Sequence, residues 1–283
     1  MRGSFKPFLI SLLLSLGVLA PFVWCGLLYY DHAHSTEPAA QAQSGVPITP
    51  GAQESMLLLL AVAPSEEVPA PSLTLLRLDC PHGRITACPL PAETVLRSPG
   101  GSVQLGESYL TAGPGRAAQL LSETLEMPVP LYLSATPAGW ESLLRSPQLR
   151  LDTSSLLDSA QRQTLGLEEP LLEFSLPQAA ALCVQCKTLL PGCYPSLRNA
   201  VWESSLQQLR PDLGALPAML RAQSSRLLTS LSATDLLRLE RILSYLSSAA
   251  RIQVKVQSMP GETQGQNFAL NEQSLALAAQ FTG

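Results

Sequence analysis

The residues of this chain that could do covalent or metal chemistry are few, and most of them are cysteines. Cys183 and Cys186 have the spacing of a redox Cys-x-x-Cys motif, and Cys193 follows nearby. Their segment is expected to be a strand rather than the helix N-terminus that lowers a thiol pKa. A zinc site would need a further ligand, and His82 is remote in the sequence. The alternatives are unreactive core thiols, which we favour, a Cys186–Cys193 disulfide, or a reactive pair.

The remaining polar residues contain no recognisable hydrolase triad. His32 and His34 lie in a polar stretch and His82 lies in an expected turn, so none is paired by pattern with serine and aspartate. A glycine-rich phosphate-binding motif is also missing from the sequence. The net charge is −4, with no cluster of lysine or arginine. Nucleic-acid binding needs a basic surface, so we expect no nucleic-acid partner.

Residues 8–30 predict a transmembrane anchor. They carry no charge and are long enough to cross ~30 Å of hydrocarbon. Residues 1–7 contain an arginine and a lysine and Asp31 follows the apolar run, so the positive-inside rule places residues 1–7 in the cytoplasm. A cleaved signal peptide is the alternative, but its apolar region is usually about 7–15 residues and ends at small residues. Cys25 could mark a lipoprotein, although Trp24 stands where a small residue is expected.

The rest of the chain divides into a tether and a domain. Residues 31–54 are rich in Ala, Gln, Ser and Pro and predict a flexible extracellular linker. Residues 55–283 are long enough for one domain with a sizeable core. Only 14% of the chain is charged, against roughly 25% in an average soluble domain. We therefore expect a single-pass protein of the cell membrane with an extracytoplasmic C-terminal domain.

The elements that would position a site alternate between strands and helices. Residues 56–62 form a continuous apolar run, which is typical of a strand buried on both faces. Residues 73–79 and 84–88 predict a hairpin around the turn 80–83. This pattern predicts an α/β domain with a mixed central sheet and helices on both faces, preceded by the transmembrane helix. Further strands are expected at residues 129–134, 148–151, 179–186 and 251–256, and helices at 116–127, 138–145, 153–165, 195–209, 213–223, 234–248 and 271–280.

Several framework segments resemble the LytR-CpsA-Psr family of cell-envelope proteins. The hairpin begins near residues 69–72 and closes with Leu-Pro-Ala-Glu-Thr at 90–94, where the family has Arg-Ser-Asp-Thr and Ile-Pro-Arg-Asp-Thr. Residues 112–117 are similar to its Gly-Gly-Pro-Glu-Leu-Ala, residues 125–132 to its Leu-Gly-Ile-Pro-Ile-Asp-Tyr-Tyr, and residues 257–262 to its Thr-Leu-Pro-Gly-Glu. The resemblance covers the anchor and residues 55–280. It implies a domain that binds polyprenyl-pyrophosphate-linked glycopolymers in an apolar tunnel and transfers them to the cell wall.

The same resemblance shows departures where the family does its chemistry. Residues 69–72 read Pro-Ala-Pro-Ser, so an arginine and a metal-binding aspartate of the family are missing. In the second motif the arginine becomes Ala92 and the aspartate becomes Glu93. Two later arginines become Val184 and Cys186. Charge-assisted hydrogen bonds contribute roughly 1.5–3 kcal/mol each, so four lost arginines would remove roughly 6–12 kcal/mol.

Three residues remain as relics of the family's site. The resemblance makes Glu93 a relic catalytic or metal-binding carboxylate, and Arg198 and Lys187 ligand-binding cations. The alternatives are an exposed residue after a strand for Glu93, and surface or salt-bridged residues for the two cations. No cofactor is expected. Mg²⁺ would be required if activity is retained, and Glu93 alone would hold it weakly.

Three functions are compatible with these residues. We favour an inactive relative of the glycopolymer transferases that binds a polyprenyl lipid or a partner during envelope assembly. The second is an active transferase that moves glycopolymers from polyprenyl-pyrophosphate carriers to peptidoglycan. The third is an interaction or regulatory module with a closed core. The expected partners are the membrane, through the N-terminal helix, and a polyprenyl lipid or cell-wall glycopolymer. In the transferase the missing cations would be supplied by Arg77, Arg84, Arg97 and Arg116.

Overall fold

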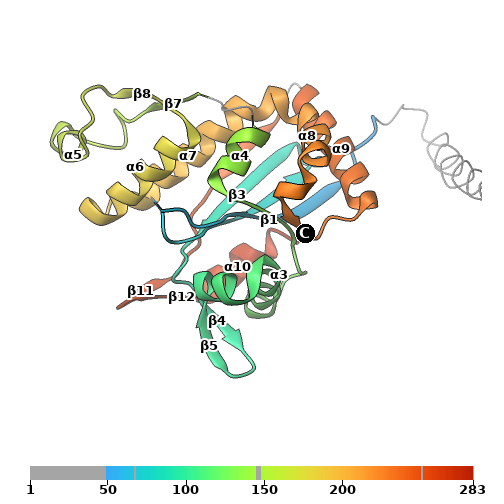
Figure 1. The fold of residues 1–283 in the computed structure, drawn as a ribbon, viewed down its shortest axis with the longest axis horizontal. Helices are drawn as coiled ribbons and strands as arrows, with labels where there is room; N and C mark the ends of the chain where they lie inside the picture. Colours follow the sequence, from blue (N-terminus) through green and yellow to red (C-terminus); the bar gives the residue numbers. More distant parts are fainter. Residues whose placement is uncertain (1–48, 67, 145–147, 250, 283) are drawn as a thin grey trace, which may run out of the picture. The chain divides into compact units, whose positions relative to one another are not determined.

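The structure is a computed structural model, and it describes residues 49–282 except 67, 145–147 and 250 (Figure 1). The expected anchor at residues 8–30 and most of the expected linker lie outside the described residues. Within the described part, no helix is both long and apolar enough to cross a membrane. Residues 50–283 form one compact unit.

A six-stranded mixed sheet forms the centre of this unit, in the order β10-β3-β2-β1-β6-β9. The expected hairpin is present as β2 and β3, and β1 lies between β2, which is antiparallel, and β6, which is parallel. Strand β10 adds parallel to β3, and β9 adds antiparallel to β6. The strands are β1 (Ser55–Val62), β2 (Ser72–Asp79), β3 (Arg84–Leu90), β6 (Leu131–Ala135), β9 (Leu228–Thr229) and β10 (Gln253–Val256).

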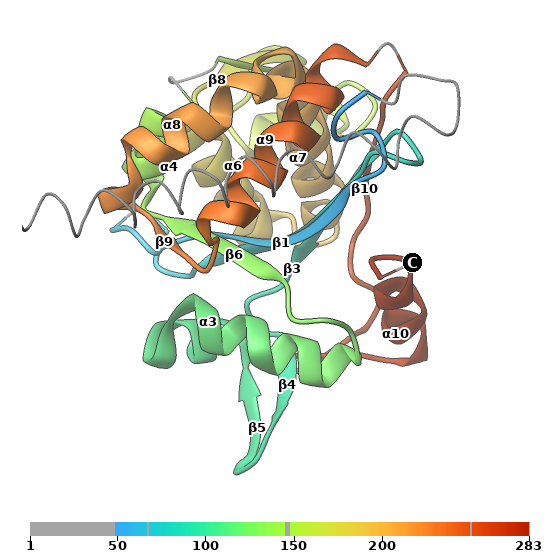
Figure 2. The ribbon, with the colours of Figure 1, turned by 90° about the vertical axis from the view of Figure 1, so that its right-hand side faces the viewer.

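Helices cover both faces of this sheet, as expected (Figure 2). Side chains alternate along β1, so Leu59 packs in one apolar layer and Leu58 packs in the other. The first layer is closed by α3 (Leu105–Leu125) and α10 (Glu272–Ala279). The second is closed by α4 (Pro137–Leu143), α7 (Tyr194–Leu209), η1 (Arg210–Ala215), α8 (Leu216–Ala222) and α9 (Ala233–Ser248), and the short helix η2 (Ser224–Arg226) follows α8 in the chain.

A smaller group of elements packs against α7 around its own apolar cluster, which includes Leu182, Cys186 and Leu197. Two further hairpins, which the sequence pattern does not predict, complete the unit (Figure 1). The group comprises β7 (Leu149–Asp152), α5 (Ser159–Thr164), β8 (Leu171–Phe174) and α6 (Leu176–Leu189), and the hairpins are β4 (Val95–Ser98) with β5 (Gly101–Gln104) and β11 (Glu262–Gln264) with β12 (Asn267–Ala269).

The expected strand at residues 179–186 is wrong, because this segment lies inside helix α6. Ser175 caps the helix in a reciprocal capping box with Gln178, and Pro177 occupies its first turn. The apolar run at residues 179–186 suggests a strand, but only the apolar residues on one face of the helix are buried. Ala179, Leu182 and Cys186 are buried there, while the outer face of the helix is exposed.

Two expected helices have different bounds. Helix α3 begins at Leu105 rather than near residue 116, and it is kinked at Gly113, whose φ is 79°. The Gly-Pro-Gly segment therefore marks a break within a helix rather than its start, since proline removes a helical hydrogen bond. The helix expected at residues 153–165 is shorter, and only α5 is helical there.

Candidate functional site

Glu93, Lys187 and Arg198 lie far apart in the sequence but meet at one end of the central sheet. Nζ of Lys187 donates a hydrogen bond to Oε1 of Glu93 at 2.5 Å. The guanidinium carbon of Arg198 lies 5.2 Å from the centre of the Tyr194 ring, and Nζ of Lys187 lies 5.8 Å from it. One aromatic ring therefore contacts both cations, within the range of cation–π attraction. We call these four residues the Glu93 cluster.

Short connections hold the members of the Glu93 cluster in place. Glu93 lies in a tight turn after β3, where Oγ1 of Thr94 donates to the carbonyl oxygen of Pro91 at 2.7 Å. Lys187 lies in the last turn of α6, and a short connection leads to Tyr194 at the start of α7. Arg198 follows Tyr194 by one helical turn, so the two side chains share one face of α7.

Arg198 is buried, with only 8% of its surface exposed. It is therefore not a surface residue, and that alternative is wrong. Its Nε has no hydrogen-bond partner among the described residues. A buried donor without a partner is costly, and the ring of Tyr194 offsets only part of this cost. The next residue, Asn199, donates from Nδ2 to Oγ of Ser258 at 3.0 Å, which ties α7 to the segment after β10.

The charges of the Glu93 cluster favour an anionic ligand. Burial raises the pKa of Glu93, but the hydrogen bond from Lys187 and the charges of Lys187 and Arg198 more than offset this effect and hold the pKa below its ordinary value. Glu93 is therefore ionised at neutral pH. The Glu93 cluster then contains two cations and one anion, and its net positive charge attracts anions.

The same geometry does not suit Mg²⁺. Magnesium requires a shell of oxygen ligands, usually one or two carboxylates with waters or phosphates. In the Glu93 cluster the one carboxylate is Glu93, and the ammonium group of Lys187 already binds one of its oxygens. In the described part of the chain, no group of three or more His, Cys, Asp or Glu residues could hold a metal. The residues present therefore do not fit the metal that the family resemblance implies.

Burial favours the protonated thiol at Cys88, Cys183 and Cys186. All five cysteines of the described residues are free, so the structure contains no Cys186–Cys193 disulfide. Burial raises the pKa of Cys88 and of Cys183 to about 12, and Arg198 offsets only part of this rise. Burial also raises the pKa of Cys186. A reactive thiolate is therefore unfavourable at these positions.

The four reserve arginines do not join the Glu93 cluster. Arg84 begins β3, at the opposite end of that strand from Glu93. Arg77 lies near the end of β2 that pairs with the start of β3, and it donates to the backbone carbonyl oxygen of Phe281. Arg97 and Arg116 are on β4 and α3. Arg116 donates to Gln119 at 2.9 Å. Arg97 forms an exposed ion pair with Glu126 at 3.8 Å.

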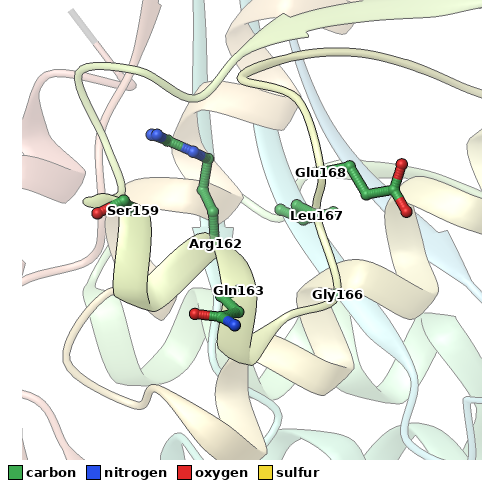
Figure 3. A pocket seen from close by; sticks show the side chains of 6 residues that line it. All are labelled: Ser159, Arg162, Gln163, Gly166, Leu167 and Glu168. Carbon is green, nitrogen blue, oxygen red and sulfur yellow. The ribbon is translucent and has the colours of Figure 1, made fainter.

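A shallow surface hollow of about 430 Å³ lies elsewhere, beside α5 (Figure 3). No residue of the Glu93 cluster lines it. The side chains of Arg162 and Glu168 diverge, and Nη1 of Arg162 donates to the carbonyl oxygen of Leu157 at 2.8 Å. The hollow therefore offers no convergent set of polar groups, as a ligand site requires. Its lining residues are Ser159, Arg162, Gln163, Gly166, Leu167 and Glu168.

Sequence reasoning misses Tyr194, although a signal for it is present. Tyr194 directly precedes Pro195, and a proline in the first turn marks a helix start. Arg198 is then four residues further along the same helix, at the spacing that brings two side chains together. Recognition of α6 as a helix, from its capping box, would also have placed Lys187 close to Tyr194.

Comparisons with known proteins identify the fold. TagT, solved bound to LI-WTA, superposes with a TM-score of 0.60 at 15% identity, over 83% of this chain and 92% of that chain. The ywtF protein of Bacillus subtilis, described as a putative transcriptional regulator, gives 0.59 at 16% identity, over 83% and 92%. TagV of B. subtilis gives 0.55 at 11% identity, over 81% and 95%. No family model and no curated protein sequence matches the chain. TagT and TagV are LytR-CpsA-Psr proteins, so the expected LytR-CpsA-Psr-like fold is confirmed.

Proposed function

We propose that this domain binds an anionic polyprenyl carrier of the cell envelope and does not cleave it. The observation that carries the proposal is the Glu93 cluster, in which a buried arginine keeps an unpartnered Nε beside an aromatic ring and a second cation. Charge-assisted hydrogen bonds to phosphate oxygens would satisfy such a donor. The shared fold with TagT, solved with LI-WTA, supports a cell-envelope ligand.

The absence of transfer chemistry is part of the proposal. A transferase of the resembled kind needs Mg²⁺ and several arginines around the pyrophosphate. Glu93 is engaged by Lys187, and the four reserve arginines are bonded or placed elsewhere. Binding can still occur, because one arginine and one lysine can hold an anion without stabilising a departing group.

The apolar part of the carrier would lie against the sheet near the carboxyl end of β1. Leu60 is on the central strand yet remains partly exposed, and Trp140 and Trp202 in the same layer are also only partly buried. Farther along this layer the side chains under α9 are closely packed, with Ile242 and Leu246 fully buried. We therefore propose a short apolar groove near Leu60 rather than a long tunnel under α9.

The proposal also includes the location of the protein. Residues 8–30 would anchor the chain in the cell membrane by a single span, and residues 50–283 would lie outside the cytoplasm. A carrier embedded in the outer leaflet would then be within reach of the domain through the linker.

The test is an affinity measurement on the full chain in detergent micelles, by isothermal titration with geranylgeranyl pyrophosphate. Arg198→Ala should weaken binding by about 10- to 100-fold, because a hydrogen bond to a charged group contributes roughly 1.5–3 kcal/mol. Arg84→Ala, which removes an exposed arginine at the other end of β3, is the matched control and should bind as the wild type does. Equal binding by Arg198→Ala and the wild type would contradict the proposal.

A further inference from the structure

Thr74 is a buried polar residue in an otherwise apolar part of β2. Its surface is 1% exposed, and its Oγ1 has no hydrogen-bond partner among the described residues. Leu73 and Leu75 pack in the layer of α3, whereas Leu76 and Leu78 pack in the layer of α7 and α9. Side chains alternate along a strand, so Thr74 faces the layer of α7 and α9.

The strand register places Thr74 beside the last residues of β3, the strand that leads to Glu93. Thr74 pairs with Leu60 of β1 on one side and with Pro89 of β3 on the other. Adjacent strands lie about 4.8 Å apart, so Thr74 is one strand away from the end of β3 that leads to Glu93. Helix α7, which carries Arg198, packs against β3 on this same face.

Oγ1 of Thr74 and Nε of Arg198 are both buried and have no hydrogen-bond partner among the described residues. Arg198 precedes Trp202 by one turn of α7, and Trp202 packs in the layer that Thr74 faces. Valine has nearly the shape of threonine and would pack there without the cost of a buried hydroxyl. Both atoms can donate a hydrogen bond, and Arg198 belongs to the net positive Glu93 cluster. The missing partner is therefore an acceptor, and an anionic one is favoured.

We infer that Thr74 is a ligand-binding residue, which donates from its hydroxyl to an oxygen of a phosphate or pyrophosphate group held by Arg198. The inference rests on the proposed function and extends its site inward from the Glu93 cluster to the face of the sheet. It places the anionic group against β2 and β3, next to the partly exposed Leu60, where an attached apolar chain would begin.

The test uses the full chain in micelles and the variant Thr74→Val. Without ligand, removal of an unpartnered hydroxyl should raise Tm by about 2–4 °C. With ligand, the same variant should bind pyrophosphate roughly tenfold more weakly, because the ligand loses one hydrogen bond. Thr74→Ser keeps the hydroxyl and should retain the affinity within a few fold. A higher Tm together with a weaker affinity in Thr74→Val would show that the hydroxyl of Thr74 binds the ligand and does not stabilise the fold.

Thr153→Val is the matched control. Thr153 is also fully buried, but its Oγ1 donates to the carbonyl oxygen of Pro170 at 2.8 Å. This control should lower Tm and leave the affinity unchanged. Inorganic pyrophosphate, geranylgeranyl pyrophosphate and geranylgeraniol are the three probes. Binding of the first two and not the third shows that the anionic group is recognised, and tighter binding of the second identifies a lipid source over a free phosphate.

The outcomes separate this inference from the proposed function. Unchanged affinity in Thr74→Val, with weaker binding in Arg198→Ala, would overturn the role of Thr74 and leave the proposed function standing. A fall in Tm for Thr74→Val without ligand would also overturn it, since the hydroxyl would then have a structural partner. Failure of the wild type to bind any of the three probes would overturn both.

Discussion

Replacement of Arg198 by methionine distinguishes a ligand-binding arginine from a structural one. Methionine keeps an unbranched side chain against Tyr194 but removes the charge. The change relieves a buried donor without a partner, which is worth about 1–3 kcal/mol. It also removes a cation–π contact at 5.2 Å, worth about 0.5–2 kcal/mol. Without ligand, the free energy of unfolding of Arg198→Met should therefore fall by no more than about 1 kcal/mol, or it should rise.

Urea unfolding followed by tryptophan fluorescence measures this change, because Trp140 and Trp202 both pack in the layer of α7 and α9. Leu197→Ala is the comparison. Leu197 is a neighbouring residue of α7 with no exposed surface, and its truncation should cost about 2–5 kcal/mol. A loss above about 2 kcal/mol in Arg198→Met would refute the reasoning, since the guanidinium would then stabilise the fold itself.

Three further predictions concern the Glu93–Lys187 pair, two glycines and the N-terminal cap of α9. Because the pKa of Glu93 is lowered in the folded state, its pair with Lys187 stabilises the fold above the ordinary carboxyl pKa and loses this contribution as pH falls through the lowered value. The side chains of Glu93 and Lys187 are 34% and 45% exposed, so Lys187→Met should lower the free energy of unfolding by only about 0.2–1 kcal/mol at pH 7 and should not change it near pH 2. Urea titrations that show an equal loss of stability at both pH values would contradict this prediction. Gly51→Ala should lower the free energy of unfolding by at least about 2 kcal/mol, because at φ +87° the added Cβ would lie 2.4 Å from a backbone oxygen of α9. Gly113→Ala, at φ +79° with no atom nearby, should lower it by only about 1 kcal/mol. Equal shifts in Tm for the two variants would show that the contact at Gly51 is relieved. Ser232→Ala should cost about 0.5–2 kcal/mol, because Ser232 caps α9 in a capping box, and an unchanged urea midpoint would show that the cap contributes nothing.

The hairpin β2–β3 and the helix α9 could be predicted from the sequence because local signals agree there. Alternating and continuous apolar runs flank a four-residue turn in the hairpin, and Ser232 precedes a regular apolar stripe in α9. Helix α6 could not be read from its apolar run alone, since a short run suits a buried strand equally well. The signal that decides it is the capping box of Ser175 with Gln178.

The composition of the site could be predicted only in part. Family resemblance supplies Glu93, Lys187 and Arg198 as candidates, but their pairing depends on a contact between the end of β3 and the connection of α6 to α7. That contact is set by tertiary packing, which no local pattern records. The burial of Arg198 and the orientation of Thr74 likewise depend on which layer each element faces.

The measurement that tests the central claim most directly is a phosphorus NMR spectrum of geranylgeranyl pyrophosphate incubated with the full chain and Mg²⁺. Binding without cleavage predicts that both phosphorus resonances shift or broaden and that no monophosphate, inorganic phosphate or pyrophosphate signal appears. Arg198→Ala should restore the spectrum of the free ligand. Growth of a product signal that is lost in Arg198→Ala would contradict the account by showing an active enzyme, and an unperturbed spectrum with the wild type would contradict it by showing no binding.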